Sequence, residues 1–376
     1  MNNSSHTLFS LIRLALGTSS EAVDLSALTK ADWEAVVDLA FDQGVAALMV
    51  DGLQKRLEVS GERLENDFLE SEELEDLRYE LFGEALSCEE DYRKYEGAIS
   101  SLARTYSEAG IEMMVLKGYG LSLNYPVPEH RPVGDIDVYL NDNPSTSSGQ
   151  ALLPAWKRGD EIIRGRGIAI DYSHHHHSVF SWKGFTVENH YDIENRYASR
   201  KGREADDLLK GIAGRNRKGV GKVFLPSANF NGIFLTSHAA SHFAGDRITL
   251  RHLLDWALFV DKEWKEIDWP FVTDWLKRLG LLKFFGCMNA LSIDGLGIAA
   301  EKFPSLDRDS ELEKRVLEDI LHPTFDEKGS GFLFKLRRFK ANMWKRNLVA
   351  SEPLVPRLVR LAWSHVVKPK KELRSR

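Results

Sequence analysis

Residues 111–140 constrain the fold more than any other stretch, because they predict two strands around a glycine turn. Residues 113–116 form a short apolar run that ends at Lys117-Gly118-Tyr119-Gly120, which is typical of a buried strand. Residues 121–125 predict a short helix that ends before a proline, and residues 135–140 predict the second strand. A glycine turn that leads from a strand into a helix leaves backbone N–H groups available to a phosphate.

The second strand contains an Asp-x-Asp pattern. Side chains alternate between the two faces of a strand, so one face carries Asp135, Asp137 and Tyr139 and the other carries Ile136, Val138 and Leu140. Two carboxylates on one open face repel each other unless a cation lies between them. Oxygen ligands of this kind suit Mg²⁺ or Mn²⁺. A metal site beside a phosphate-binding turn indicates phosphoryl or nucleotidyl transfer, whereas the alternative is a strand that ends in solvated aspartates.

Four short motifs in this order resemble a known family. The motifs are Leu116-Lys117-Gly118, Tyr125-Pro126, Arg131 and Asp135-Ile136-Asp137. They resemble an uncharacterised bacterial nucleotidyltransferase-like family of the polymerase-β-like nucleotidyltransferase superfamily, and they are similar also to aminoglycoside nucleotidyltransferases. The resemblance implies an α+β fold with a mixed-sheet palm, and transfer of an NMP from ATP or another NTP with release of pyrophosphate. It also implies catalytic Asp135 and Asp137, with Mg²⁺ or Mn²⁺ as cofactor.

The resemblance also suggests the remaining nucleotide-site residues. Residues 187–191 resemble a Val-Glu-Ile-His-Trp motif of the family, which makes Glu188 the expected third metal-binding and catalytic carboxylate. Asp192, on the same face of the predicted strand, is the alternative. We expect the nucleotide phosphates to be bound by Lys117, Gly118, Tyr119, Arg131 and His190, the last with a further option in proton transfer. Lys117 departs from the superfamily, which usually has its first glycine there.

Four consecutive histidines, residues 174–177, fall within another predicted strand. Alternation would put His174 and His176 on one face and His175 and His177 on the other. A pair on one face supplies only two ligands to a transition metal, so we expect histidines that support the cleft or reach the triphosphate.

The chain has 376 residues, which suffices for two or three domains. We expect an N-terminal helical region at residues 1–108, a palm at 109–200 and a C-terminal helical region with a basic tail at 201–376. Within these regions, the pattern predicts a long helix over 74–106, a loop over 141–150, a helix over 151–158, strands over 168–172, 174–182 and 185–193, and a linker over 201–222. Further helices are expected at 271–282, 312–321, 332–344 and 354–367.

The C-terminal region supplies weaker expectations for the acceptor side of the cleft. His238 and His242 lie four residues apart on one predicted helix, and Arg251 and Asp255 lie four apart on the next. His238, His242, Arg247 and Asp255 are candidates for the cleft wall. The alternative is a polar network between the helices that includes an Arg251–Asp255 pair.

Composition limits the compartment and the partners. The net charge of −6 argues against a dedicated nucleic-acid coat, although residues 335–376 contain 13 lysines or arginines and only two acids. This basic region is either a solvated helix face with a loose tail or a weak contact surface for a polyanion such as RNA or anionic lipid. Two separated cysteines, a polar segment at residues 1–6 without a signal-peptide pattern, and no apolar stretch long enough to span a bilayer predict a cytoplasmic protein without a transmembrane segment.

Several functions remain open at this level. The acceptor is an unknown small molecule, glycan precursor, tRNA or protein. One alternative is a nucleotidyltransferase-like toxin that modifies tRNA or protein. Another is a catalytically inactive module that binds nucleotide, and a third is a helical scaffold with an incidental Asp-x-Asp.

Overall fold

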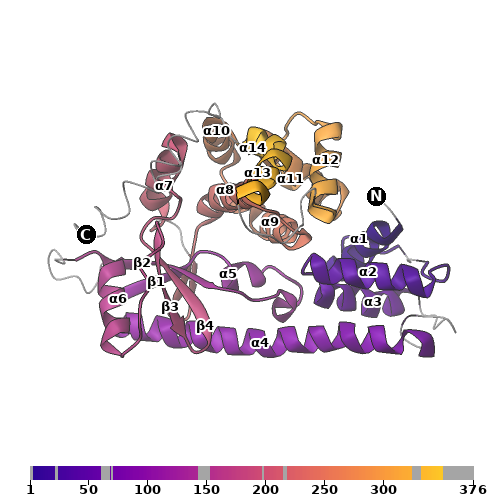
Figure 1. Ribbon diagram of the computed structural model, residues 1–376, viewed down its shortest axis with the longest axis horizontal. Helices are drawn as coiled ribbons and strands as arrows, with labels where there is room; N and C mark the ends of the chain where they lie inside the picture. Colours follow the sequence, from indigo (N-terminus) through magenta and orange to yellow (C-terminus); the bar gives the residue numbers. More distant parts are fainter. Residues whose placement is uncertain are drawn as a thin grey trace.

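One long helix, α4 (Glu75–Glu108), runs along a whole side of the molecule (Figure 1). Its apolar residues recur at helical spacing and are buried, among them Leu81, Tyr95 and Leu102. One half of α4 packs against helices α2 (Lys30–Asp42) and α3 (Ala46–Ser60), on which α1 (Asn3–Leu16) packs in turn, and the other half packs under the sheet. The computed structural model describes residues 3–21, 24–60, 68, 71–142, 153–196, 199–214, 218–323 and 332–349.

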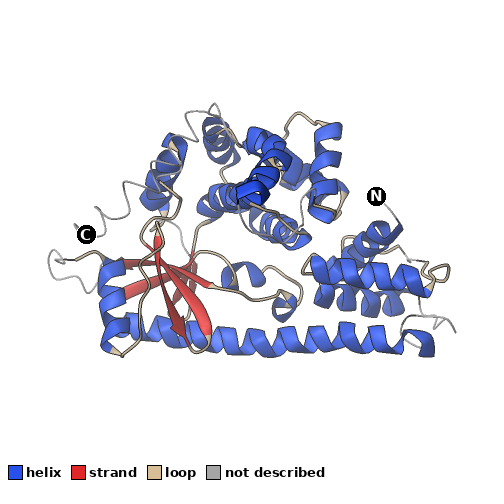
Figure 2. Ribbon diagram, viewed as in Figure 1, coloured by secondary structure: helices blue, strands red, loops and turns tan. Residues whose placement is uncertain are grey.

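A single mixed sheet of six strands holds the centre of the described chain (Figure 2). The strands are β1 (Ile111–Val115), β2 (Ile136–Asp142), β3 (His177–Trp182), β4 (Phe185–His190), β5 (Lys218–Val220) and β6 (Val223–Leu225), in the order β3-β4-β2-β1-β6-β5. β2 runs antiparallel to β1 and parallel to β4, and β1 runs parallel to β6. The predicted α+β class is therefore confirmed, and the sheet takes two strands from beyond residue 200.

The two faces of the sheet meet different neighbours. Apolar side chains of β1, β2 and β4, such as Met113, Val138 and Val187, pack against α4 and α6 (Ala155–Gly165). The opposite face carries Asp137 of β2 and Glu188 and His190 of β4 and lies towards α8 (Ala228–Gly245). Short α5 (Tyr119–Ser122) and 3-10 turn η2 (Pro128–His130) connect β1 to β2.

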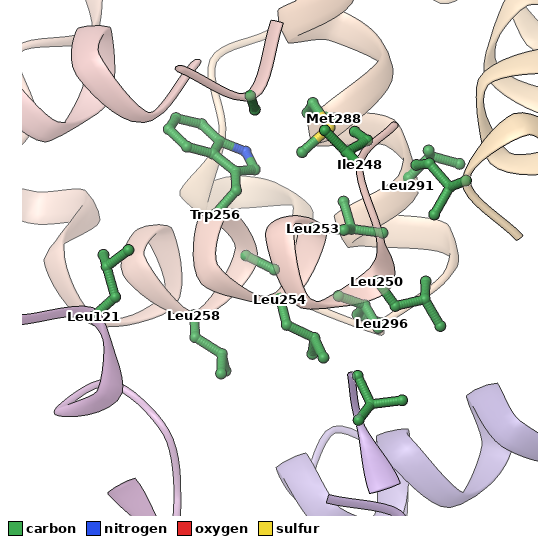
Figure 3. Packing of buried hydrophobic residues seen from close by; sticks show 14 of the residues in the cluster. Leu121, Ile248, Leu250, Leu253, Leu254, Trp256, Leu258, Met288, Leu291 and Leu296 are labelled. Atoms are coloured by element: carbon green, nitrogen blue, oxygen red, sulfur yellow. The ribbon is translucent and has the colours of Figure 1, made fainter. Parts of the chain in front are cut away.

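The C-terminal helices form a second layer above the sheet (Figure 1). They are α7 (Arg200–Ile212), α9 (Leu250–Glu263), α10 (Trp269–Leu279), α11 (Leu282–Asp294), α12 (Ser310–Leu321), α13 (Phe332–Ala341) and α14 (Met343–Val349), together with α8. Figure 3 shows Leu250, Leu253, Leu254 and Leu258 projecting in several directions from α9, with Leu121 of α5 and Met288 of α11 nearby. One hydrophobic core thus joins α9 to the N-terminal helices and fixes the roof of the site.

The predicted strand over 168–172 is wrong, because only an isolated bridge joins Asp171 to Val179 there. The Asp171 carboxylate accepts hydrogen bonds from the Ser173 backbone N–H at 2.8 Å and from its hydroxyl at 2.9 Å. This local turn ends the extended backbone. β3 therefore begins at His177, and His174 to His176 lie in a bend instead of the predicted strand.

The predicted linker over 201–222 is also wrong, since it contains α7 and β5. Ser199 caps α7 by accepting the Gly202 N–H at 2.9 Å, and Ala205 and Leu209 form its buried face. The polar composition of this stretch reflects the exposed side of an amphipathic helix.

Smaller differences concern element ends. The helix expected over 121–125 lies at Tyr119–Ser122, the one over 151–158 extends over Ala155–Gly165, and the one over 332–344 is divided into α13 and α14. The largely buried α11 was not predicted. Residues 143–150 of the predicted loop, the helix over 354–367 and the basic tail lie outside the described residues. No helix among the described residues combines the length and apolarity needed to cross a membrane.

Candidate active site

The predicted carboxylates come together because β2 and β4 are parallel neighbours. The register places Asp137 directly beside Glu188, on the face that lies towards α8. Carboxylate oxygens of these two residues and a ring nitrogen of His190 lie within 4.8 Å of one another. Asp135, just before β2, lines the same cavity of about 740 Å³. Burial, followed by the charges of Glu188 and Asp137, raises the pKa of Asp135, which shows that negative charge is concentrated here.

Asp137 is 2% exposed and has two nitrogen partners. Lys117 Nζ lies 3.2 Å from its Oδ1, and His190 Nε2 lies 3.1 Å from the same oxygen. Burial alone would raise the pKa of Asp137, but Lys117 and then His190 hold that pKa well below its ordinary value. Burial would lower the pKa of His190, whereas its hydrogen bonds with Asp137 and Glu188 raise it to about 9. Lys117, which stands where the superfamily usually has its first glycine, therefore lies beside the Asp137 carboxylate.

Gly118 follows Lys117 with a positive φ of 62°. A Cβ at this position would lie 2.5 Å from the Tyr95 hydroxyl oxygen. That hydroxyl donates a hydrogen bond of 3.1 Å to the backbone carbonyl of Asp135. A glycine is therefore required here, both by the backbone conformation and by the contact that ties α4 to the start of β2.

A smaller cavity of about 250 Å³ adjoins the larger one. The two cavities share five lining residues, Lys117, Asp135, Asp137, His238 and His242. The larger one extends towards β3, β4 and α7, and the smaller one extends towards Gly118 and α9. The carboxylates of Asp135 and Asp137 therefore lie where the two cavities meet.

Arg131 and Asp255 form a bidentate ion pair at the smaller cavity. Arg131 Nε and Nη2 donate to Asp255 Oδ1 and Oδ2 at 2.7 and 2.8 Å, and the Tyr125 hydroxyl donates to Oδ1 at 3.0 Å. Asp255 thus takes Arg131 as its ion-pair partner instead of Arg251, with which the sequence had paired it. Each of these two charges already has a partner in the other. The phosphate-binding role of Arg131 and the acceptor-side role of Asp255 stay predictions.

His238 and His242, which were also expected on the acceptor side, border both cavities from α8. His238 Nε2 lies 3.5 Å from Lys117 Nζ, and the rings of His238 and His242 are 4.5 Å apart between centroids. Burial, followed by the charge of Lys117, lowers the pKa of each. Arg247 lies elsewhere, since it pairs with Asp42 of α2 at 3.0 Å and lines neither cavity.

Two further predicted residues are not brought to the carboxylates. The Tyr119 hydroxyl donates to Glu96 of α4 at 3.2 Å, and this side chain lines neither cavity. Asp192 forms an ion pair with Lys210 of α7 and also lines neither cavity. Glu188, and not Asp192, is therefore the acid beside Asp137.

The histidine run does not follow the expected alternation. His174 and His177, expected on opposite faces, stack with ring centroids 4.7 Å apart, because the backbone bends before β3. His176 and His177 both line the larger cavity. Burial, followed by the neighbouring His190, lowers the pKa of each to about 3.

Some cavity residues were not singled out from the sequence. Glu194, partly buried, lines the larger cavity, and burial followed by the charge of Asp206 raises its pKa to about 8. Its position two residues beyond Asp192 was the available signal. Arg346 and Val349 of α14 border the same cavity, and no local pattern relates this helix to residues more than 150 positions earlier.

Comparison with known proteins identifies a family for most of the chain. A family model described as an uncharacterised nucleotidyltransferase matches residues 29–292. No curated protein and no solved structure matches the chain. The matched segment contains the three carboxylates, Lys117 and the helices α8 and α9, and it ends before α12.

Proposed function

The chain belongs to the uncharacterised nucleotidyltransferase family, and on that premise we propose that it moves an NMP from an NTP to an acceptor in a metal-dependent reaction. The observation that carries the proposal is the position of Asp135 and Asp137 where the two cavities meet. A group transfer needs a donor and an acceptor that approach one reacting centre from two sides. A volume of about 740 Å³ is within the range of small-molecule sites.

The carboxylates fit a divalent cation. Asp135, Asp137 and Glu188 line one cavity, and burial followed by the charges of Glu188 and Asp137 raises the pKa of Asp135. Oxygen donors of this type are those that Mg²⁺ and Mn²⁺ prefer. When bound, the ion would neutralise phosphate charge and favour ionisation of the attacking hydroxyl.

The protein's own residues then position the reactants. Lys117 and the Gly118 turn receive the phosphates on the side of the smaller cavity, where Arg251 adds positive charge. The acceptor hydroxyl or phosphate attacks the α-phosphorus from the larger cavity. One P–O bond forms as the bond between the α-phosphorus and pyrophosphate breaks. Where the acceptor is a hydroxyl, its proton passes to one of the three carboxylates.

Lys117 also supports a second candidate, a module that binds nucleotide without turnover. Its ammonium group lies 3.2 Å from Asp137, where it competes with a cation for that carboxylate. In an active enzyme this group moves to a phosphate when the metal–nucleotide complex binds. In a binding module it stays on Asp137.

A thermal-shift panel separates the two candidates. Each of the four NTPs is added with Mg²⁺, Mn²⁺ or EDTA to the wild type and to Asp137→Asn, and pyrophosphate release is measured in parallel. Ligands that bind the native state raise its apparent stability. For an active enzyme we expect a metal-dependent rise in melting temperature and pyrophosphate release, and we expect both to be lost in Asp137→Asn. A shift that is indifferent to metal and to the substitution supports the module, and retained pyrophosphate release in the variant overturns the assignment of Asp137.

A further inference from the structure

Three histidines lie beside the carboxylates, and two of them, His176 and His177, have no role in the proposed transfer. Ring nitrogens of His176, His177 and His190 all lie within 4.8 Å of one another. Glu188 adjoins this group, with Oε1 at 3.5 Å from His177 Nε2 and Oε2 at 3.4 Å from His190 Nε2. Four side chains with metal-binding atoms therefore converge on one side of the larger cavity.

His190 has polar partners on both ring nitrogens, Asp137 at Nε2 and the Asp192 carbonyl at Nδ1, whereas His176 and His177 lack some of the partners that buried nitrogens usually have. His177 is 5% exposed, and neither of its ring nitrogens makes a hydrogen bond in the described structure. The same holds for His176 Nδ1. A buried polar atom without a partner costs roughly 1–3 kcal/mol, so such atoms are rare unless a ligand satisfies them.

The backbone holds the rings in this arrangement. The bend before β3 puts His176 and His177 next to each other, with ring centroids 4.3 Å apart. The His176 carbonyl accepts the N–H groups of Tyr191 and Asp192, each at 3.0 Å, which ties the bend to the end of β4. The ring of His190 lies 5.1 Å from that of His177 and 5.6 Å from that of His176. The bend and the end of β4 thus hold the three rings close together.

The geometry points to a site for a first-row transition metal ion of the Zn²⁺ class, held by His176, His177 and His190 with Glu188 as fourth ligand. Imidazole nitrogens suit such ions, whereas Mg²⁺ takes oxygen ligands. Zn–N bonds of about 2.0–2.1 Å place two nitrogens of a tetrahedral site roughly 3.4 Å apart. Side-chain rotations that displace the nitrogens by about 1 Å would bring them to that spacing. This inference goes beyond the proposed function, because it requires no nucleotide.

The test uses the untagged full chain, freed of metal with a chelator and titrated with Co²⁺ and Zn²⁺ in the absence of nucleotide. We expect one equivalent of Co²⁺ with the visible absorption of a nitrogen-ligated four-coordinate ion, and its displacement by Zn²⁺. Absence of stoichiometric binding overturns the inference.

Matched variants distinguish a built site from metal capture by an exposed histidine run. His177→Gln and His190→Gln should raise the Kd for Co²⁺ by more than the roughly 10–100-fold typical of changes behind the ligands. His175→Gln, which alters the same run outside the group of three, should leave the Kd within about threefold, well under that outer-shell cost. Equal losses in His175→Gln and His177→Gln, with none in His190→Gln, would identify a tag-like run and overturn the inference. If His190→Gln fails to fold by circular dichroism, His176→Gln replaces it in the same comparison.

Asp137→Asn separates this inference from the proposed function. It should lower nucleotide-dependent pyrophosphate release by about 10²–10³-fold. Asp137 is not among the four ligands but lies 3.1 Å from His190 Nε2, so the Kd for Co²⁺ should rise by no more than the roughly 10–100-fold of a change behind the ligands. A protein that binds Co²⁺ and releases no pyrophosphate overturns only the transferase proposal. Loss of Co²⁺ binding in Asp137→Asn as large as in His177→Gln places the ion at the carboxylates and overturns the histidine site.

Discussion

Two groups of charged side chains border the two cavities and are built in opposite ways. The closed pair consists of Arg131 and Asp255, with the Tyr125 hydroxyl as a third member. The open group consists of Asp135, Asp137 and Glu188. In the closed pair, both carboxylate oxygens accept from one guanidinium group. In the open group, three carboxylates line the larger cavity, and the Lys117 ammonium group and the His190 imidazole both contact one carboxylate oxygen of Asp137.

The difference separates a structural role from a binding role. A saturated buried ion pair holds two elements in register, here the connection before β2 and helix α9, and breaking it leaves a buried charge. A group with excess charge of one sign is stable only with a ligand or nearby cations, so it is the better place for chemistry. The contrast leads to four predictions, from the largest expected effect to the smallest.

Arg131→Ala should destabilise the fold by about 3–5 kcal/mol, because Asp255 loses its partner in a buried environment. Urea unfolding monitored by circular dichroism measures this change. Arg308→Ala is the matched control, since Arg308 also contacts Glu313 at 2.7 Å but its side chain is 48% exposed. That control should cost no more than about 1 kcal/mol. Equal costs would remove the structural side of the comparison.

Asp137→Asn should lower pyrophosphate release by about 10²–10³-fold, because the reaction loses a charge that positions the reacting groups. Initial rates at saturating NTP measure the effect. Asp142→Asn, at the far end of the same strand and paired with Arg158, should retain wild-type rates. A similar loss in both variants would mean that the strand, and not the open group, is sensitive to the change.

Lys117→Met should raise the KM for NTP by about 10–100-fold, the value of one hydrogen bond to a charged group. Without nucleotide, Mn²⁺ should bind this variant more tightly, because the ammonium group no longer competes for Asp137. Isothermal titration with Mn²⁺ and steady-state kinetics measure the two effects. Lys210→Met, which removes the partner of Asp192 outside both cavities, is the control. Unchanged Mn²⁺ affinity in Lys117→Met would contradict the competition.

Glu194 gives the smallest effect, on the pH dependence of stability. Its pKa is raised to about 8 by burial and then by Asp206, while an unfolded glutamate titrates near about 4.3. Between these values the native state binds more protons than the unfolded state, so the free energy of unfolding falls as pH rises. Glu194→Gln should flatten this decline in melting temperatures recorded from pH 5 to pH 8. A wild-type slope in the variant would show that other groups dominate.

Much of the fold was predictable because its signals are local. The capping box of Thr29 and Asp32 marks the start of α2, and the apolar spacing within α4 marks a long helix. The alternation in β2 correctly separated Asp137 from Ile136 and Val138. The resemblance to a nucleotidyltransferase-like family is confirmed, whereas the domain boundaries and the roles of the individual site residues stay predictions.

The errors arose where polar composition was taken for irregular structure or for a regular strand. The stretch containing α7 is rich in charge because its exposed face is large, and its buried residues are few. The histidine run was expected to be extended, but the hydrogen bonds of Asp171 with Ser173 bend the chain first. Short-range hydrogen bonds of this kind override a weak strand pattern.

The sequence alone determined which chemistry was available: a glycine turn, an Asp-x-Asp strand and a Glu-x-His strand, each readable from spacing within one element. Only the tertiary structure decided which of these groups meet. The parallel pairing of β2 with β4 put Asp137 beside Glu188, and the packing of α9 gave Asp255 to Arg131 across 124 positions of sequence. The physical reason is that periodicity reports which side of an element a residue faces. The neighbour on that side is selected by burial and charge pairing over the whole chain.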